Sequence, residues 1–365
     1  MSNAGARLAL AVVTLLGAVP AGAQNVQIAT APSPFLRGAT PEDPAKLAAN
    51  PSATGIFLVN ADGSGRRLLV AEKVALLRPG CWSPDGRTIL YHSLGNDDAG
   101  MKMMAMHFPL YAVDAGGGNR RRIVDFPVTD FGWSPDGRFL FLTSGFEDAT
   151  FVPGPERSGK IALYVLDTQT GTRTRLTDSV EITVGVSWAP DGKRLAYAGK
   201  GKDDSRPDIF IVNRDGSGTR RLVNLPTADL NPRWSPDGKS ILFVSAPHDS
   251  QGQGIGFYVV DVKTAKLTFV ADFAGWPNIQ WTPDGRSVLV GASKSTMTLA
   301  SPDGKSRTTV ADVGLDAVFS PDGSELFYRT PPPDGSIWAI RISDMVRRKV
   351  ADAGGTYCLS PATKR

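Results

Sequence analysis

Residues 81–93 read CWSPDGRTILYHS, and five closely related phrases follow along the chain. Their common core is an aromatic residue, then Ser, Ala or Thr, then Pro-Asp-Gly, then a short apolar run. The copies are WSPDG at 82–86, 133–137 and 234–238, WAPDG at 188–192, WTPDG at 281–285 and FSPDG at 319–323. A phrase that returns roughly every 40 to 55 residues indicates one structural unit used several times.

Each copy predicts a tight turn between two antiparallel strands. Proline presets φ for the second turn position, Asp suits the third, and Gly takes the left-handed backbone from which strand pairing resumes. The runs after the turn, such as KSILFVS at 239–245, alternate as strands do. A second apolar hairpin follows, for example LYVLDTQTGTRTRLT at 163–177. Each unit therefore holds four antiparallel strands, which we call A to D, and this is the pattern of a β-propeller blade.

The two ends of the chain predict how the ring closes. GIFLVNADGSGRRLLV at 55–70 is a C–D hairpin without its A and B strands, and GTYCLSPATKR at 355–365 reads as an A strand. NVQIAT at 25–30 is a weak candidate for the missing B strand. Because a propeller must cover its last sheet edges, we expect these segments to combine. The prediction is an all-β, seven-bladed propeller with a composite closing blade; six blades plus a separate hairpin is the alternative.

The first residues have the pattern of a secretory signal peptide. A single charge at Arg7 precedes an apolar run at 8–19 and small residues at 21–23, so cleavage is expected after Ala23. The expected domains are a signal peptide at 1–23, an N-terminal extension at 24–54 and the propeller at 55–365. This pattern predicts a periplasmic or secreted protein without a membrane span after signal removal; an uncleaved anchor is the alternative.

The repeats resemble the WD40-like (PD40) repeats of the TolB propeller, which also occur in propeller domains of tricorn-type and prolyl-oligopeptidase-type proteases. The resemblance rests on the aromatic-Ser/Ala/Thr-Pro-Asp-Gly turn and on the LYVLD hairpin, over about residues 55–361. It implies a periplasmic propeller. TolB carries an α/β domain before its propeller, whereas only a short stretch precedes these repeats, so the resemblance does not imply TolB's own role.

The B–C connections are the expected binding surface. They are long and individual, whereas the A–B and C–D turns at the opposite face are short and uniform, and function concentrates on variable loops. The candidate loops are 94–109, 145–160, 199–208 and 246–256. The candidate binding residues on them are Asp97, Asp98, Met101, Met104, His107, Phe108, Glu147, Asp148, Phe151, Arg157, Lys202, Asp203, Arg206 and His248.

Three metal or disulfide hypotheses accompany this surface. Met101, Met103, Met104, Met106 and His107 suit Cu(I) or an adaptable apolar contact. A disulfide between Cys81 and Cys358, which stand in the same register of two neighbouring A strands, is an alternative to two buried thiols. The turn aspartates are expected to have a purely structural role, in which each bonds its own backbone and no cofactor is needed. Binding of Ca²⁺ by these aspartates is the alternative. Those aspartates are Asp85, Asp136, Asp191, Asp237, Asp284 and Asp322.

The charge pattern and the absent motifs narrow the function. The net charge is +4, with Lys and Arg scattered along the chain, so a nucleic-acid partner is not expected. There is no G-x-S-x-G or H-E-x-x-H motif, which leaves protease chemistry unsupported. The expected function is a monomeric, non-catalytic module that binds a protein or a cell-envelope component. The alternative is a propeller enzyme acting on carbohydrate, a lyase or hydrolase with its site at the channel mouth.

Overall fold

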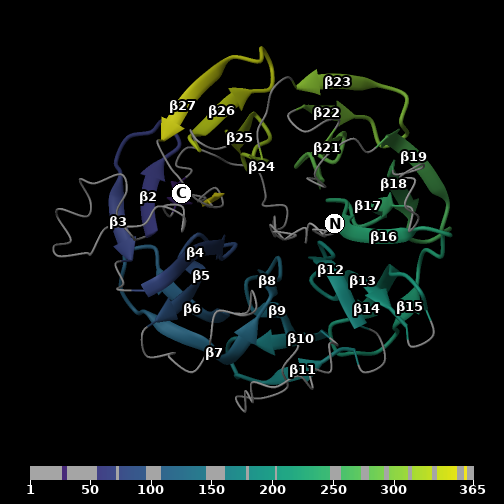
Figure 1. Cartoon of the computed structure of the whole chain (residues 1–365), viewed down its shortest axis with the longest axis horizontal. Helices are drawn as coiled ribbons and strands as arrows, with labels where there is room; N and C mark the ends of the chain where they lie inside the picture. The colour runs from purple at the N-terminus through teal and green to yellow at the C-terminus, as the bar shows by residue number, and fades with distance from the viewer. Residues whose placement is uncertain are drawn as a thin grey trace, which may run out of the picture.

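Seven four-stranded antiparallel sheets surround a common centre in this computed structural model, which places the chain among the all-β propellers (Figure 1). The structure describes residues 27–30, 56–70, 74–95, 108–144, 161–177, 181–201, 204–246, 256–272, 279–291, 296–310, 315–330, 335–351 and 357–359. Within these ranges, no helix has the length and hydropathy needed to cross a membrane.

Six blades are continuous in sequence, and each runs from the innermost strand A to the outermost strand D. Blades one and two are β4 (Val74–Trp82), β5 (Thr88–Gly95), β6 (Phe108–Asp114), β7 (Arg121–Val128) and β8 (Asp130–Trp133), β9 (Phe139–Ser144), β10 (Ala162–Asp167), β11 (Arg173–Arg175). Blades three and four are β12 (Glu181–Trp188), β13 (Arg194–Lys200), β14 (Asp208–Asn213), β15 (Arg220–Arg221) and β16 (Ala228–Trp234), β17 (Ser240–Ala246), β18 (Gly256–Asp261), β19 (Leu267–Asp272). Blades five and six are β20 (Gln280–Trp281), β21 (Val288–Gly291), β22 (Met297–Ala300), β23 (Arg307–Val310) and β24 (Leu315–Phe319), β25 (Glu325–Arg329), β26 (Ile337–Arg341), β27 (Arg347–Ala351).

The closing blade combines both ends of the chain, in the order β28 (Tyr357–Leu359), β1 (Gln27–Thr30), β2 (Ile56–Asn60), β3 (Arg67–Val70). Ile28 pairs with Leu359 on one side of β1 and with Val59 on the other. The predicted composite sheet is therefore confirmed, and its B strand is β1, at Gln27–Thr30 within the predicted stretch. Backbone hydrogen bonding explains this arrangement, because the pairing of β1 covers two sheet edges at once.

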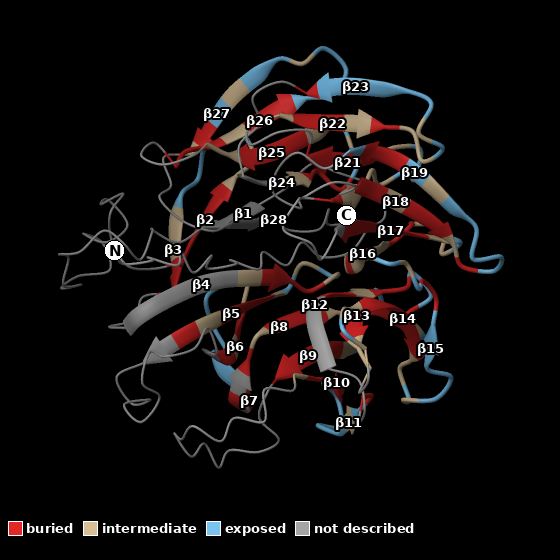
Figure 2. Ribbon diagram, turned by 45° about the vertical axis from the view of Figure 1, so that its right-hand side comes forward, coloured by how far each residue is buried: buried red, intermediate tan, exposed pale blue. Residues whose placement is uncertain are grey.

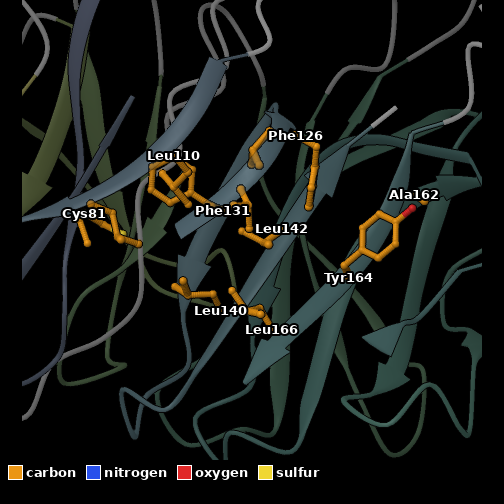
Figure 3. Packing of buried hydrophobic residues seen from close by; sticks show 13 residues of the cluster. Cys81, Leu110, Phe126, Phe131, Leu140, Leu142, Ala162, Tyr164 and Leu166 are labelled. Carbon is orange, nitrogen blue, oxygen red and sulfur yellow. The ribbon is translucent and has the colours of Figure 1, made fainter. Parts of the chain in front are cut away.

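The repeated aromatic side chain packs between neighbouring sheets. Trp188 of blade three lies against Phe141 and Leu163 of blade two, and Trp234 of blade four lies against Ala196 and Ile209 of blade three. Large apolar residues fill each seam in this way, as the cluster between blades one and two shows (Figure 3). Among the residues whose burial is described, the buried ones are concentrated in the inner strands of the blades, while the outer strands carry most of the exposed ones (Figure 2).

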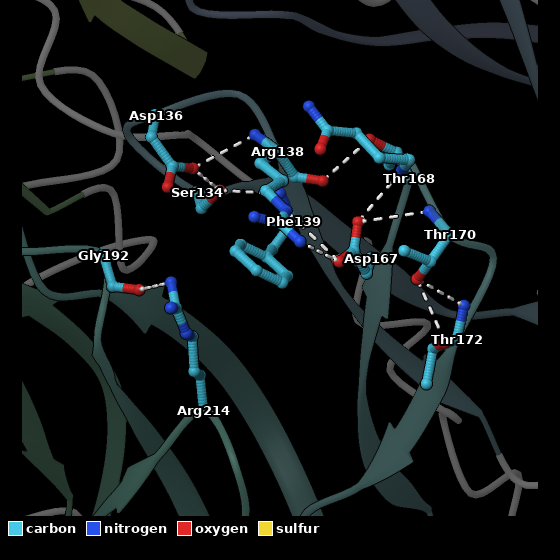
Figure 4. Close-up of polar contacts among 11 residues, drawn as sticks. Ser134, Asp136, Arg138, Phe139, Asp167, Thr168, Thr170, Thr172, Gly192 and Arg214 are labelled. Atoms are coloured by element: carbon cyan, nitrogen blue, oxygen red, sulfur yellow. Dashed lines mark hydrogen bonds and ion pairs between the residues drawn. The ribbon is translucent and has the colours of Figure 1, made fainter.

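The Pro-Asp-Gly turns satisfy their own polar groups. In blade two, Asp136 accepts a hydrogen bond from the Ser134 hydroxyl at 2.5 Å and another from the Arg138 backbone N–H at 3.0 Å (Figure 4). The same pair of bonds recurs at Asp85, Asp237, Asp284 and Asp322. These carboxylates thus have the structural role expected of turn residues.

The turns also contact one another around the axis. Gly238 has a φ of +69°, and a Cβ added there would lie 3.2 Å from Cγ of Pro190 in the preceding blade. Gly137, Gly192, Gly285 and Gly323 meet the proline of the preceding turn in the same manner. The A–B end of the ring is therefore lined by similar turns, whose polar groups are bonded within the turn itself.

Candidate functional site

Buried charged side chains gather at the B–C end of the seam between blades three and four. Asp229 lies at the start of β16, Asp208 starts β14, and the Asp229 backbone N–H donates to the Pro207 carbonyl oxygen at 2.9 Å. The two blades are thereby joined at the point where both carboxyl groups enter the interior. We call Asp204, Asp208, Arg221, Asp229, Thr227 and Ser245 the seam cluster.

Two β-bulges shape the inner strands at this seam. The register of β16 shifts between Leu230 and Arg233, and that of β12 shifts between Ile182 and Val186. Within them Asn231 has a φ of +53° and Gly185 a φ of +75°. A Cβ added to Gly185 would lie 2.9 Å from the Cα of Asn231, so only glycine admits this approach. Bulges of this kind redirect side chains beside functional sites.

Asp229 is fully buried, and only one of its two carboxyl oxygens has hydrogen-bond partners in the described part of the chain. Its Oδ1 accepts from the Ser245 hydroxyl at 2.7 Å and from Thr227 Oγ1 at 3.4 Å. Its Oδ2 is buried without a hydrogen-bond partner in the described part of the chain. Burial raises the pKa of Asp229 to about 7, and the charge of Asp208 adds to the increase, against the lowering effect of the Ser245 hydrogen bond.

Asp208 shares Arg221 with Asp204. Arg221 lies 3.2 Å from Asp208 Oδ2 and also donates to Asp204 Oδ2, while its guanidinium lies 5.3 Å from the Phe210 ring centroid. Asp208 Oδ1 is buried and unpartnered among the described residues. Burial raises the pKa of Asp208, and the positive charge of Arg221 opposes that increase. Arg221 thus anchors the B–C connection at Asp204 to the blade beneath it.

Two further charged residues lie on the innermost strands of blades two and four. Arg233 lies on β16 and Asp130 on β8, both innermost strands, and Asp130 is buried. Nε of Arg233 is buried without a hydrogen-bond partner in the described ranges, although its NH1 donates to the Pro232 carbonyl oxygen at 3.2 Å. Burial lowers the pKa of Arg233, and the charge of Asp130 opposes this. The centre of the ring therefore holds charge from blades on either side of blade three.

The seam cluster has the properties of an acid–base or polar recognition site. A carboxyl group whose pKa lies near neutrality can hold or release a proton there, and such groups concentrate at functional sites. In the part of the chain that the structure describes, no three or more His, Cys, Asp or Glu side chains are grouped so as to hold a metal ion.

Most of the predicted binding residues fall outside the described side chains. Arg206 is described, partly buried, two residues before β14 and beside the seam cluster. Phe108 starts β6, but its side chain is not described. The others lie wholly outside the described residues, so the binding and copper hypotheses remain predictions: Asp97, Asp98, Met101, Met103, Met104, Met106, His107, Glu147, Asp148, Phe151, Arg157, Lys202, Asp203 and His248.

The cysteine hypothesis is likewise open. Cys81 is buried on β4 at 5% exposure. Cys358 pairs with Ala29 through the backbone of β28, and its side chain lies outside the described part. A disulfide between these two residues therefore stays a prediction.

Sequence reasoning missed Asp208, Asp229 and Arg221. The available signal was an ionisable residue within or beside an apolar strand, as in PDIFIV at 207–212 and ADL at 228–230. Such residues are rarely buried without a partner or a function.

Comparison with known proteins identifies the repeat and several relatives. The model of the TolB beta propeller domain matches residues 156–362. Dipeptidyl-peptidase 5 of Porphyromonas gingivalis is 25% identical over 297 residues, covering 68% of this chain and 42% of that protein. The uncharacterized peptidase YuxL of Bacillus subtilis is 26% identical over 205 residues, covering 55% of this chain and 29% of that protein. The chain thus spans less than half the length of either relative.

Two solved structures show the same fold at low identity. TolB from Acinetobacter baumannii superposes with a TM-score of 0.50 at 18% identity, covering 78% of this chain and 63% of that one. An oligogalacturonate lyase in complex with manganese superposes with a TM-score of 0.58 at 15% identity, covering 76% and 79%. At these identities the likeness concerns architecture alone.

Proposed function

The chain belongs to the TolB beta propeller family, and from that premise we propose that it is an exported, non-catalytic module that binds a protein or cell-envelope component on its B–C face. Export rests on the signal-peptide pattern at residues 1–23. N-terminal sequencing of the protein from the envelope fraction tests it, with Gln24 as the expected first residue.

The difference between the two ends of the blades carries this proposal. At the A–B end, carboxylates such as Asp136 are used by their own turns. At the B–C end, Arg221 holds Asp204 against Asp208, and Arg206 lies in the same connection. A rigid scaffold that supports varied polar loops is the usual arrangement of a binding surface.

Site-specific photocrosslinking tests the face that is used. A benzophenone amino acid is placed at Arg206 on the B–C face, and at Lys239 on an A–B turn as the matched control. Lys239 is 77% exposed, so it is at least as accessible to a partner. The proposal expects a discrete adduct in envelope extract from position 206 and none from position 239. The same adduct from both positions, or from position 239 alone, contradicts it.

Asp229 favours one alternative function, a propeller enzyme acting on carbohydrate. Its pKa of about 7 suits a general acid or base, and the buried carboxyl group of Asp208 is close enough to influence that pKa. Screening lyase and hydrolase activity on acidic and neutral polysaccharides tests this alternative. Activity that Asp229→Asn abolishes, without loss of folding, would replace the binding proposal.

A further inference from the structure

Two carboxyl groups of the seam cluster approach each other from blades three and four, and each has an acceptor oxygen left over. Asp208 and Asp229 are 3% and 0% exposed. Oδ1 of Asp208 and Oδ2 of Asp229 are buried without a hydrogen-bond partner among the described residues. Ionisation of Asp229 places a second negative charge beside Asp208 in a seam that excludes water, so the seam favours the protonated form of Asp229.

Arg221 divides its charge between a buried and a partly exposed carboxylate. Its Nη1 lies 3.2 Å from Asp208 Oδ2, and its Nη2 donates a hydrogen bond to Asp204 Oδ2. The two acceptors differ in their access to water, because the Asp208 side chain is 4% exposed and the Asp204 side chain is 25% exposed. Water can therefore solvate Asp204 if the guanidinium leaves it, whereas Asp208 depends on Arg221.

Asp204 begins a short stretch of the B–C connection, residues 204–207, which we call the anchored segment. The Asp204 backbone N–H donates to the Gly201 carbonyl oxygen at 3.1 Å, and Asp204 Oδ2 accepts from the Gly201 N–H at 2.9 Å. At the other end, the Pro207 carbonyl oxygen accepts from the Asp229 backbone N–H at 2.9 Å. The anchored segment is thus held to blade three through Arg221 and to blade four beside Asp229.

Among the described residues, Arg221 is the cation best placed to respond to a change at Asp229. Arg206, within the anchored segment, influences the pKa of Asp208 but forms no ion pair with a described carboxylate. Burial raises the pKa of Tyr197 on β13, so that its hydroxyl stays neutral. The other ionisable residues on strands packed against β16 are Arg194 at the A–B end and, paired in the β12–β13 ladder, Glu181 and Lys200.

We propose that the proton on Asp229 decides whether Arg221 holds the anchored segment, which makes this segment a pH-sensitive element of the B–C face. While Asp229 is protonated, Arg221 bridges Asp208 and Asp204. When the proton passes to solvent, the buried pair carries two negative charges, and Arg221 moves fully to Asp208 and releases Asp204 to water. Burial raises the pKa of Asp229 to about 7, so the segment is held below this pH and released above it.

Hydrogen–deuterium exchange of the full chain, with no partner or substrate present, tests this inference. The rates are corrected for the intrinsic pH dependence of amide exchange and resolved to Ser205 and Arg206 by fragmentation. We expect these amides to exchange at least about threefold faster at about pH 8 than at about pH 6. The C–D turn of the same blade is the internal reference, because hydrogen bonds from Ser217 lower the pKa of Asp215 and keep it ionised at both values.

Three variants separate the steps of the proposal. Asp229→Asn keeps the buried group neutral, so the anchored segment should exchange slowly at both pH values. Asp204→Asn weakens the contact with Arg221, so the segment should exchange fast at both. Asp237→Asn makes the same substitution on an A–B turn of blade four, where Asp237 accepts from the Ser235 hydroxyl, and this matched control should keep the wild-type difference.

Three results overturn the proposal: equal corrected rates at both pH values in the wild type, a pH difference that survives in Asp229→Asn, and wild-type protection of Asp204→Asn at the lower pH. If Asp229→Asn melts early, Arg221→Lys replaces it. A lysine ammonium cannot bridge two carboxylates as a guanidinium fork does, so exchange should be fast at both pH values, and a wild-type difference would contradict the role of Arg221. Because no partner is present, these results are independent of the crosslinking that tests the proposed function.

Discussion

Arg348 donates a hydrogen bond to the carbonyl oxygen of Ala61, a residue 287 positions earlier in the chain. The bond joins the outer strand of blade six to the hairpin of the closing blade. Glu325 orients the guanidinium by accepting two further bonds, at 2.9 and 2.7 Å. Arg67 and Arg220 make the corresponding bond to the next blade, at the carbonyl oxygens of Ala115 and Val262. The same hydrogen bond from an arginine to a carbonyl oxygen of the next blade is therefore repeated around the rim. At Arg348 this bond stabilises the closure of the ring.

Replacing Arg348 should weaken the closure. Arg348→Ala removes the bond to Ala61 and the pair with Glu325, and we expect a loss of about 1–3 kcal/mol in the free energy of unfolding, reduced by partial exposure. Arg286→Ala is the control, since that side chain is 88% exposed and lies on a turn. Urea unfolding measures both, and equal losses would contradict a role in closure.

The turn glycines should differ in how much they tolerate alanine. Gly238 and Gly171 both have positive φ, +69° and +74°. A Cβ at Gly171 would meet nothing within 4 Å, whereas one at Gly238 would press on Pro190 at 3.2 Å. Gly171→Ala should cost only the backbone strain, about 1–2 kcal/mol, and Gly238→Ala at least about 1 kcal/mol more. Similar melting temperatures for the two variants would show that the contact between turns is unimportant.

The contribution of the Trp188 indole hydrogen bond to the free energy of unfolding should be measurable by comparing two buried tryptophans. Nε1 of Trp188 donates to the Gly132 carbonyl oxygen at 3.1 Å, while Nε1 of Trp234 has no hydrogen-bond partner in the described residues. Their exposures are 8% and 6%, so the loss of apolar burial on mutation to Phe should be similar. Trp188→Phe should therefore cost about 1 kcal/mol more than Trp234→Phe in denaturant unfolding. A larger loss for Trp234→Phe than for Trp188→Phe would show that this hydrogen bond does not stabilise the seam.

Asp229 should make stability depend on pH in an unusual direction. Its carboxyl pKa rises from 3.8 to about 7 on folding. Between these values the unfolded chain has lost the proton that the folded protein keeps, so the contribution of Asp229 to stability falls as pH rises from about 4 to about 7. Asp229→Asn mimics the protonated group and should gain stability relative to the wild type across this window, by at most about 4 kcal/mol.

The measurement is the difference in unfolding free energy between Asp229→Asn and the wild type, followed from pH 4 to pH 8. Asp237→Asn serves as the control of opposite sign, because the Ser235 hydroxyl lowers the pKa of Asp237. Its loss should be greatest near neutral pH and shrink on acidification. A difference for Asp229→Asn that does not change with pH would show that its carboxyl is not protonated in the folded state.

Local sequence was sufficient to predict the blade. The Pro-Asp-Gly turn at 84–86 and its copies form as expected, because the φ preferences of Pro and Gly act within the turn itself. The packing of Trp188 between sheets was also predictable, since a large aromatic residue at the same place in every unit must lie in every seam. The bulge at Asn231 was not predictable, because it depends on the close approach of Gly185 from the neighbouring blade.

What the sequence by itself determined is the repeating unit: four strands, their turns and the missing strands at each end that have to combine. Only the tertiary structure decided which charges meet. Asp208 and Asp229 belong to different blades, and their shared burial follows from how two sheets face each other across a seam. The physical reason is that blade geometry repeats along the sequence, whereas electrostatic interactions depend on distance in space.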